Sequence, residues 1–71
     1  MDASATPLAG QVRARRKSLR LTQAQVADLA GCSERFVRAL EAGKTGVRLD
    51  KVMEVLHVLG LEVTLAPRIG P

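Results

Sequence analysis

Aromatic residues are almost absent from this chain: Phe36 is the only one among 71 residues, and there is no Trp or Tyr. The core must therefore be filled by smaller side chains, mainly Val, Leu and Ala, which favours short helices that pack closely. A chain of this length buries only about 60% of the surface that it exposes when unfolded. The sequence predicts one small domain with a marginal core, for which help from a partner chain is unsurprising.

Cysteine and histidine are equally scarce, with one residue of each type, Cys32 and His57. A single cysteine forms no internal disulfide, and no group of His and Cys has metal-ligand spacing, so neither kind of staple is expected. His57 stands alone on a polar helix flank, Cys32 suits an apolar position, and no carboxylate pair lies in an evident pocket. We expect no metal, no cofactor and no enzymatic activity.

Long apolar runs are missing as well. No stretch approaches the roughly 20 apolar residues that cross a bilayer. The first ten residues, MDASATPLAG, have neither the basic region nor the long apolar region of a secretory signal. We therefore expect a soluble protein in the reducing environment of the cytoplasm.

Negative charge is sparse in the middle of the chain. Residues 13–48 hold nine Lys and Arg but only three Asp and Glu, a net charge of +6, whereas the remaining residues carry −2. A local excess of positive charge is typical of proteins that bind a polyanion such as nucleic acid, although many such charges are only solvated.

Four helical segments follow an N-terminal arm, residues 1–5, that is expected to be disordered. Proline is favoured at the first position of a helix, so Pro7 predicts a helix over about 7–18. Three of its side chains are expected to share one face: Leu8, Val12 and the stem of Arg16. A fourth helix, ended by Gly60, is marked by five apolar residues: Leu49, Val52, Val55, Leu56 and Leu59.

The second helix begins at Thr22 with two start signals. Gln25 lies three residues on, as a capping box requires, and Leu21 and Val26 stand at the positions of a hydrophobic staple. Gly31 ends the helix, because glycine adopts the left-handed conformation without steric cost. Its expected buried side consists of Val26, Ala27, Leu29 and Ala30.

The third helix follows after only three residues, with Ser33 as its cap and Gly43 at its far end. A connection this short fixes the angle between the two helices. At about 100° per residue, Val37 and Leu40 share the inner face. The opposite, outward face consists of Arg35, Arg38, Ala39 and Ala42.

Residues 61–66 change to a strictly alternating pattern in which Leu61, Val63 and Leu65 share one side. We expect a strand here, with residues 67–71 as a tail. No other segment of the chain is predicted to be a strand, so its backbone groups need an outside partner. The simplest partner is the same strand of a second copy, which would create a two-fold homodimer; the alternative is a frayed tail.

Two helices joined by a tight, glycine-containing turn form a helix-turn-helix, whose second helix enters the major groove of DNA. The segment LTQAQVADLAGCSERFVRALEAGK, residues 21–44, resembles the hallmark of the lambda-repressor-like, XRE-type family. The wider run to residue 65 resembles HipB-type antitoxins, partners of HipA-type kinase toxins. The resemblance covers residues 7–66 and implies an all-α, lambda-repressor-like bundle of four short helices, with a helix-turn-helix domain over 6–60.

The resemblance also implies roles for particular residues. The start of the third helix is expected to read bases, since Arg donates two hydrogen bonds to guanine and Glu accepts one from cytosine. Phosphate contact or plain solvation is the alternative for each of these residues. The candidate base-reading residues are Ser33, Glu34, Arg35, Arg38 and Ala39.

Phosphate contacts are implied for Thr22, Gln23 and Lys44, and the free amides at the start of a helix do favour an anion. Arg13 joins these candidates, although Arg13, Arg15 and Lys17 are equally explained as residues that keep the first helix soluble. Arg16 and Glu41 match a pair that joins the first and third helices in this family, so we expect a partly buried ion pair.

Two positions depart from the family pattern. Arg20 stands where the family commonly has glycine, and a positive φ there would cost about 1–2 kcal/mol. Phe36 lies at the edge of the inner face, where it is expected to join the core; contact with a thymine methyl or with a partner is the alternative.

These features predict a dimeric repressor of a palindromic operator on duplex DNA, associated with the nucleoid. In the antitoxin form of this hypothesis, the protein also neutralises a HipA-like kinase and autoregulates its operon. The alternatives are a free-standing XRE-type regulator without a toxin and a dimerisation or adaptor module.

Overall fold

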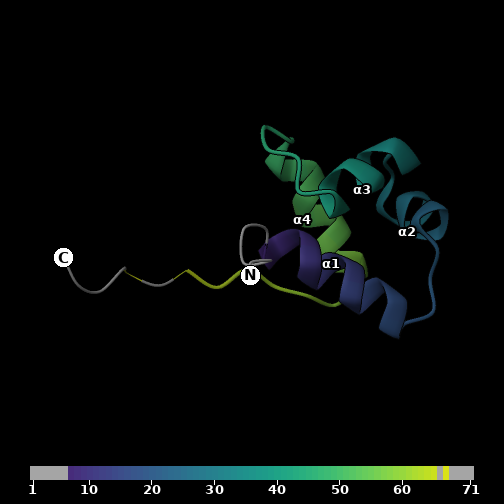
Figure 1. Cartoon of the computed structure of the whole chain (residues 1–71), viewed down its shortest axis with the longest axis horizontal. Coiled ribbons are helices and arrows are strands. Elements are labelled where there is room, and N and C mark those ends of the chain that lie inside the picture. The colour runs from purple at the N-terminus through teal and green to yellow at the C-terminus, as the bar shows by residue number, and fades with distance from the viewer. Residues whose placement is uncertain (1–6, 66, 68–71) are drawn as a thin grey trace.

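The computed structural model describes residues 7–65 and 67, and it contains four α-helices in this part of the chain. The helices are α1 (Pro7–Ser18), α2 (Gln23–Ala30), α3 (Glu34–Glu41) and α4 (Leu49–Val58). They form a bundle in which α2 packs against α3 and α4, while α1 packs against α3 (Figure 1). The all-α helix-turn-helix architecture is confirmed. None of the described helices is long and apolar enough to span a membrane.

The start of α2 has the predicted chemistry in full. The Gln25 backbone N–H donates to Thr22 Oγ1 at 3.0 Å, and the Thr22 N–H donates to Gln25 Oε1 at 2.8 Å. At the other end, Gly31 has φ 71°, and the Cys32 N–H donates to the Ala27 carbonyl at 3.0 Å. These bonds fix both ends of an eight-residue helix that would not be stable alone.

Ser33 then starts α3, because its hydroxyl accepts the Phe36 backbone N–H at 3.0 Å. The far end of α3 closes at Gly43, which has φ 83° and donates to the Leu40 carbonyl at 3.1 Å. The turn from α2 to α3 is therefore set at both sides by capping bonds, and α3 is held at one angle to α2.

The end of α1 carries backbone strain. Arg20 has φ 59°, the only positive φ at a residue other than glycine in the described part of the chain. This conformation lets the Leu21 N–H donate to the Arg16 carbonyl at 3.1 Å and so closes the helix. Arg20 therefore adopts the positive φ whose cost the sequence raised.

The core lies where all four helices meet and contains only apolar residues among those described. Val12, Val26, Val37 and Val55 are fully buried at its centre. Cys32 and Phe36 are half-buried and pack against this cluster. Burial raises the pKa of the Cys32 thiol, which Lys51 only partly opposes, so Cys32 behaves as a small apolar residue.

Three apolar residues of the predicted helices are exposed, Leu8, Leu29 and Leu49, and for Leu29 the expectation of a buried position was wrong. In α1 the buried positions are Ala9 and Val12, and Leu8 lies on the neighbouring stripe. Leu29 is 63% exposed because Val26, Ala27 and Ala30 define the buried face of α2. Leu49 is the first residue of α4 and is exposed, whereas Val52, Val55 and Leu56 form the buried face of that helix. Periodicity identified each helix correctly, but short helices leave the edges of the apolar face ambiguous.

After α4, Gly60 adopts φ 70° and the segment 61–65 leads away from the helices (Figure 1). Leu61 packs against the core, whereas Val63 and Leu65 are exposed. No strand is formed by residues 61–65 in the single chain, so the paired strand across a homodimer stays a prediction. The predicted arm over 1–5 lies outside the described residues, as do Ala66 and all of the predicted tail except Pro67.

Candidate nucleic-acid interface

Helix α3 presents one side to solvent and the other to the core. Val37 and Leu40 are buried, so they anchor the helix from below. Along the outward side, Ser33, Glu34, Arg35 and Arg38 are exposed and Ala39 is half-buried. All five candidate base-reading residues are therefore at least partly accessible to solvent. Their contacts with bases stay a prediction.

A charged joint fixes α3 to α1 and to the start of α2. Arg16 donates to Glu41 twice, from Nε to Oε2 at 2.6 Å and from Nη2 to Oε1 at 3.0 Å. Its Nη1 also donates to the Leu21 carbonyl at 2.9 Å. The side chains of Arg16 and Glu41 are only 11% and 4% exposed. The predicted ion pair is confirmed, and it is nearly buried.

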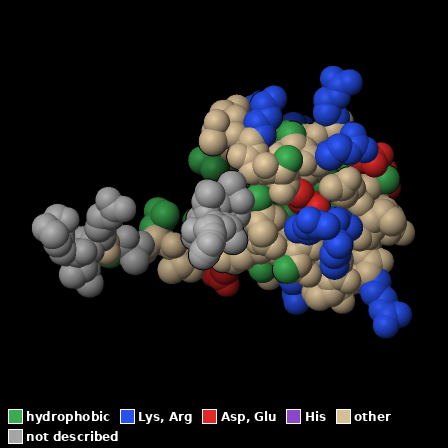
Figure 2. Space-filling view, in the orientation of Figure 1, with side chains coloured by type: hydrophobic (Ala, Val, Ile, Leu, Met, Phe, Trp, Pro, Cys, Tyr) green, Lys and Arg blue, Asp and Glu red, His purple; other side chains and the backbone are tan. Residues whose placement is uncertain are grey.

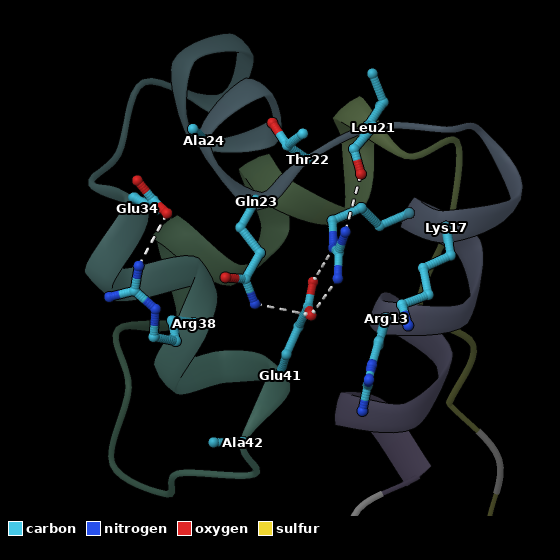
Figure 3. Close-up of a pocket in the computed structure, with 11 residues that line it drawn as sticks. Arg13, Lys17, Leu21, Thr22, Gln23, Ala24, Glu34, Arg38, Glu41 and Ala42 are labelled. Carbon is cyan, nitrogen blue, oxygen red and sulfur yellow. Dashed lines mark hydrogen bonds and ion pairs between the residues drawn. The ribbon is translucent and has the colours of Figure 1, made fainter.

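The same carboxylate also holds Gln23, the first residue of α2. Gln23 Nε2 donates to Glu41 Oε1 at 3.1 Å, and this bond is visible beside the ion pair (Figure 3). One buried acid thus joins α1, α2 and α3. An amide has two N–H donors and a carbonyl oxygen, so Gln23 keeps polar groups that can bind another partner.

The pKa of Glu41 reflects this environment. Burial alone raises the pKa of a carboxyl group, but here the hydrogen bonds from Arg16 and Gln23, together with the charges of Arg16 and Arg13, outweigh it. The net pKa of Glu41 lies below its ordinary value, and the hydrogen bond from Arg16 raises the pKa of that guanidinium. The joint is therefore fully ionised at neutral pH.

A first depression, of about 640 Å³, lies between α1, the start of α2 and the outward side of α3. Most of the polar side chains around it are cationic or amide groups, and Thr22 and Gln23 contribute the start of α2 (Figure 3). The capping box occupies the amides of Thr22 and Gln25. The amides of Gln23 and Ala24 have no hydrogen-bond acceptor among the described residues. This depression therefore suits a phosphate group. Its charged residues are Arg13, Arg16, Lys17, Glu34, Arg38 and Glu41.

A second depression, of about 270 Å³, lies on the opposite side of α3, against the loop that leads to α4. Its cations are Arg35, Lys44 and Arg48. Helix α3 is therefore a ridge with a basic depression along each side. A helix with its side chains is about 10–12 Å across, and the major groove of B-DNA is about 12 Å wide, so a helix of this size can enter that groove.

The outward side of α3, which is the candidate reading face, carries two arginines, Arg35 and Arg38, and their surroundings differ. Arg38 Nη2 donates to Glu34 Oε2 at 2.8 Å, and the two side chains are 61% and 48% exposed. No carboxylate among the described residues pairs with Arg35. Its guanidinium is therefore available without breaking an existing bond, which favours Arg35 as the stronger base-reading candidate.

The remaining cations of α1 separate into two groups. Arg13 and Lys17 line the first depression. Arg15 instead donates from Nε to the Leu59 carbonyl at 2.8 Å and so satisfies the end of α4.

Two other contacts had no sequence signal: Lys51 donates to the Gly31 carbonyl at 3.3 Å, and Arg48 pairs with Asp50 at 2.6 Å. Val47 and Gly46 also line the second depression, which no periodicity identifies because they lie in a loop.

Positive side chains are not confined to α3. In the space-filling view, Lys and Arg side chains project from several sides of the helical body (Figure 2). The two depressions therefore gain significance from their position beside α3 more than from charge alone.

The profile of the helix-turn-helix domain family matches residues 7–69. The chain belongs to that family. A similar protein is the uncharacterized HTH-type transcriptional regulator y4mF of Sinorhizobium fredii (strain NBRC 101917 / NGR234). The two are 44% identical over 57 residues, which are 79% of this chain and 75% of that protein. Together with the fold, these findings identify an XRE-like helix-turn-helix, DNA-binding transcriptional regulator.

Proposed function

We propose that this helix-turn-helix protein is a sequence-specific transcriptional repressor that binds a palindromic operator as a homodimer. The observation that carries the proposal is the joint between Arg16, Glu41 and Gln23. It locks α3, the proposed recognition helix, to the start of α2, so the proposed base-reading and phosphate-binding groups keep a fixed spacing. Fixed spacing between such groups is what register on duplex DNA requires.

Each candidate residue has a place in this proposal. Arg35 and Arg38 reach base edges, with Glu34 beside them, while Ser33 and Ala39 allow close approach. Thr22, Gln23 and Arg13 contact phosphates of one strand, and Lys44 contacts those of the other. No catalytic step is part of this proposed function, and a protein bound to chromosomal DNA would be associated with the nucleoid.

The direct test is selection of duplexes from a random library by the full chain, followed by titration at several salt concentrations. We expect an inverted repeat whose half-sites lie one helical turn, or a multiple of it, apart. The logarithm of affinity should fall with the logarithm of salt concentration by about 0.9 for each phosphate neutralised. Binding that is indifferent to both sequence and salt would contradict the proposal.

The homodimer is proposed to form through residues 61–65. The backbone N–H groups of residues 62–65 make no hydrogen bond within the described part of the chain, and Leu65 is 89% exposed. An alternating segment in this state is suited to pair with a second copy. Val63→Asp should therefore abolish the dimer and weaken operator binding while the helices stay folded.

Leu29→Asp is the matched control, because Leu29 is also an exposed apolar residue, 63% exposed against 49% for Val63, but lies on α2. Sedimentation at fixed concentration should show dimers for the wild type and for this control, and monomers for Val63→Asp. Dimers in all three proteins would place the interface elsewhere.

The finer proposal is that the regulator is a HipB-like antitoxin that restrains a HipA-like kinase. Its support is the sequence resemblance over residues 7–66. Purification from the native cell, with identification of the bound proteins and bound DNA, distinguishes the two forms. A kinase in the complex supports the antitoxin, whereas DNA alone indicates a free-standing XRE-type regulator.

A further inference from the structure

The second depression has a composition that phosphate binding does not explain. Beside its three cations it is lined by three apolar side chains, those of Phe36, Ala39 and Val47, which are here called the apolar floor. A phosphate needs hydrogen-bond donors, and an apolar surface offers it nothing. The floor therefore fits a different chemical group of the same ligand.

Duplex DNA offers one apolar group in the major groove, the C5-methyl of thymine. The cationic rim, to which Arg35 and Lys44 contribute, matches the charge of the DNA backbone. Arg35 belongs both to this depression and to the outward side of α3. A base edge approached by Arg35 consequently has the apolar floor beside it.

The floor is also held in place before DNA arrives. The Phe36 backbone N–H is bound by the Ser33 hydroxyl at 3.0 Å, and the ring packs against the core. Val47 packs against the same core from the loop. A surface that is already rigid loses little conformational freedom when it makes a contact.

We propose that Phe36, Ala39 and Val47 form a recognition site for a thymine methyl within two base pairs of the base that Arg35 reads. The inference rests on the proposed sequence-specific DNA binding and adds a base preference to it. The distance follows from geometry: one helical turn, from Arg35 to Ala39, rises about 5.4 Å, and stacked bases rise about 3.4 Å each.

The test leaves the protein unchanged. Each thymine of the selected operator is replaced in turn by uracil, which removes only the methyl group, and affinity is measured for the full chain. Burial of one such group is worth about 0.8 kcal/mol, which corresponds to about fourfold in affinity for each half-site. We expect this loss at one thymine in each half-site, within two base pairs of the position at which Arg35→Ala relaxes base preference.

Protein variants then connect the methyl effect to this site. Phe36→Leu keeps an apolar floor and should keep the discrimination against uracil. Phe36→Ser should reduce that discrimination to less than twofold, and its helix content is checked by circular dichroism. Leu29→Ala, on exposed surface of α2, should leave both affinity and discrimination unchanged. If Phe36→Ser does not fold, Val47→Thr, which makes another part of the apolar floor polar at nearly constant volume, replaces it in this comparison.

Three outcomes are distinguishable. A fourfold loss near the Arg35 position that disappears with Phe36→Ser supports the inference. Sequence-specific binding with equal affinity for thymine and uracil at every such position overturns it and leaves the proposed function intact. Absence of any sequence preference overturns the proposed function itself.

Discussion

Replacement of Arg16 by methionine tests the charged joint most directly. Methionine keeps much of the length of the side chain but removes both bonds to Glu41 and the bond to the Leu21 carbonyl. Glu41, only 4% exposed, is left as a buried acid with Gln23 as its remaining partner. Breaking one side of a buried pair costs about 3–5 kcal/mol.

That cost is large for a chain of this size. At about 0.05–0.15 kcal/mol per residue, a 71-residue protein has a free energy of unfolding of about 4–11 kcal/mol. Domains of this size lose about 4–8 °C of melting temperature per kcal/mol, so Arg16→Met should melt about 12 °C or more below the wild type. Thermal unfolding is followed by circular dichroism at neutral pH and at a fixed protein concentration.

Arg38→Met is the matched control because it breaks the exposed pair with Glu34 on the same protein. Exposed pairs of this kind are worth about 0.3–0.5 kcal/mol, so the control should melt within a few degrees of the wild type. Equal melting temperatures for the two variants would refute the claim that burial gives the joint its importance.

The pH dependence of stability provides a second test of the charged joint, because the wild type and Arg16→Met should respond differently when the pH is lowered. In the wild type the pKa of Glu41 is lowered, so its contribution to stability is present above the unfolded value of about 4.3 and is lost as the pH falls through the lower, folded value. In Arg16→Met, burial without the guanidinium should raise the pKa of Glu41. The free energy of unfolding of that variant should then increase as the pH is lowered from 7 to 5, whereas that of the wild type should not.

Three further variants separate base reading, phosphate binding and backbone strain. Arg35→Ala should cost about 1–3 kcal/mol for the preferred operator and relax preference at one base position, as measured by competition with single-base variants. Lys44→Ala should weaken binding to all sequences alike and reduce the salt slope by about 1 for each subunit, as measured by titration. Arg20→Gly should raise stability by up to about 1 kcal/mol in urea unfolding, because relief of the positive φ, worth about 1–2 kcal/mol, exceeds the entropic cost of glycine.

The capping signals explain why so much of the fold was predictable. Ser33 and the capping box of Thr22 and Gln25 are local: the residues that form each bond lie within three positions of one another. Local bonds of this kind fix where α2 and α3 begin whatever the rest of the chain does. The glycines at 31 and 43 act in the same way, since their positive φ is a property of single residues.

Contacts between distant residues were predictable only in part. The pair of Arg16 and Glu41 followed from family resemblance, but the bond from Gln23 to the same carboxylate did not. Arg15 was indistinguishable in sequence from the other cations of α1, yet it caps α4, 44 positions away. The partner that such a side chain finds depends on how the helices pack, and the type of side chain alone does not determine that packing.

The small size of the reading face favours action in pairs. One recognition helix offers Arg35 together with the paired Glu34 and Arg38, and each good base contact discriminates by about 1–3 kcal/mol. A genome presents about 10⁶–10⁹ competing non-specific sites. So few base contacts do not supply enough discrimination to outweigh that number of competitors. Two copies on an inverted repeat double the discriminating free energy without any new contact type. The pairing proposed for residues 61–65 would bring the two copies together, so the loss of dimers expected for Val63→Asp should also remove operator specificity.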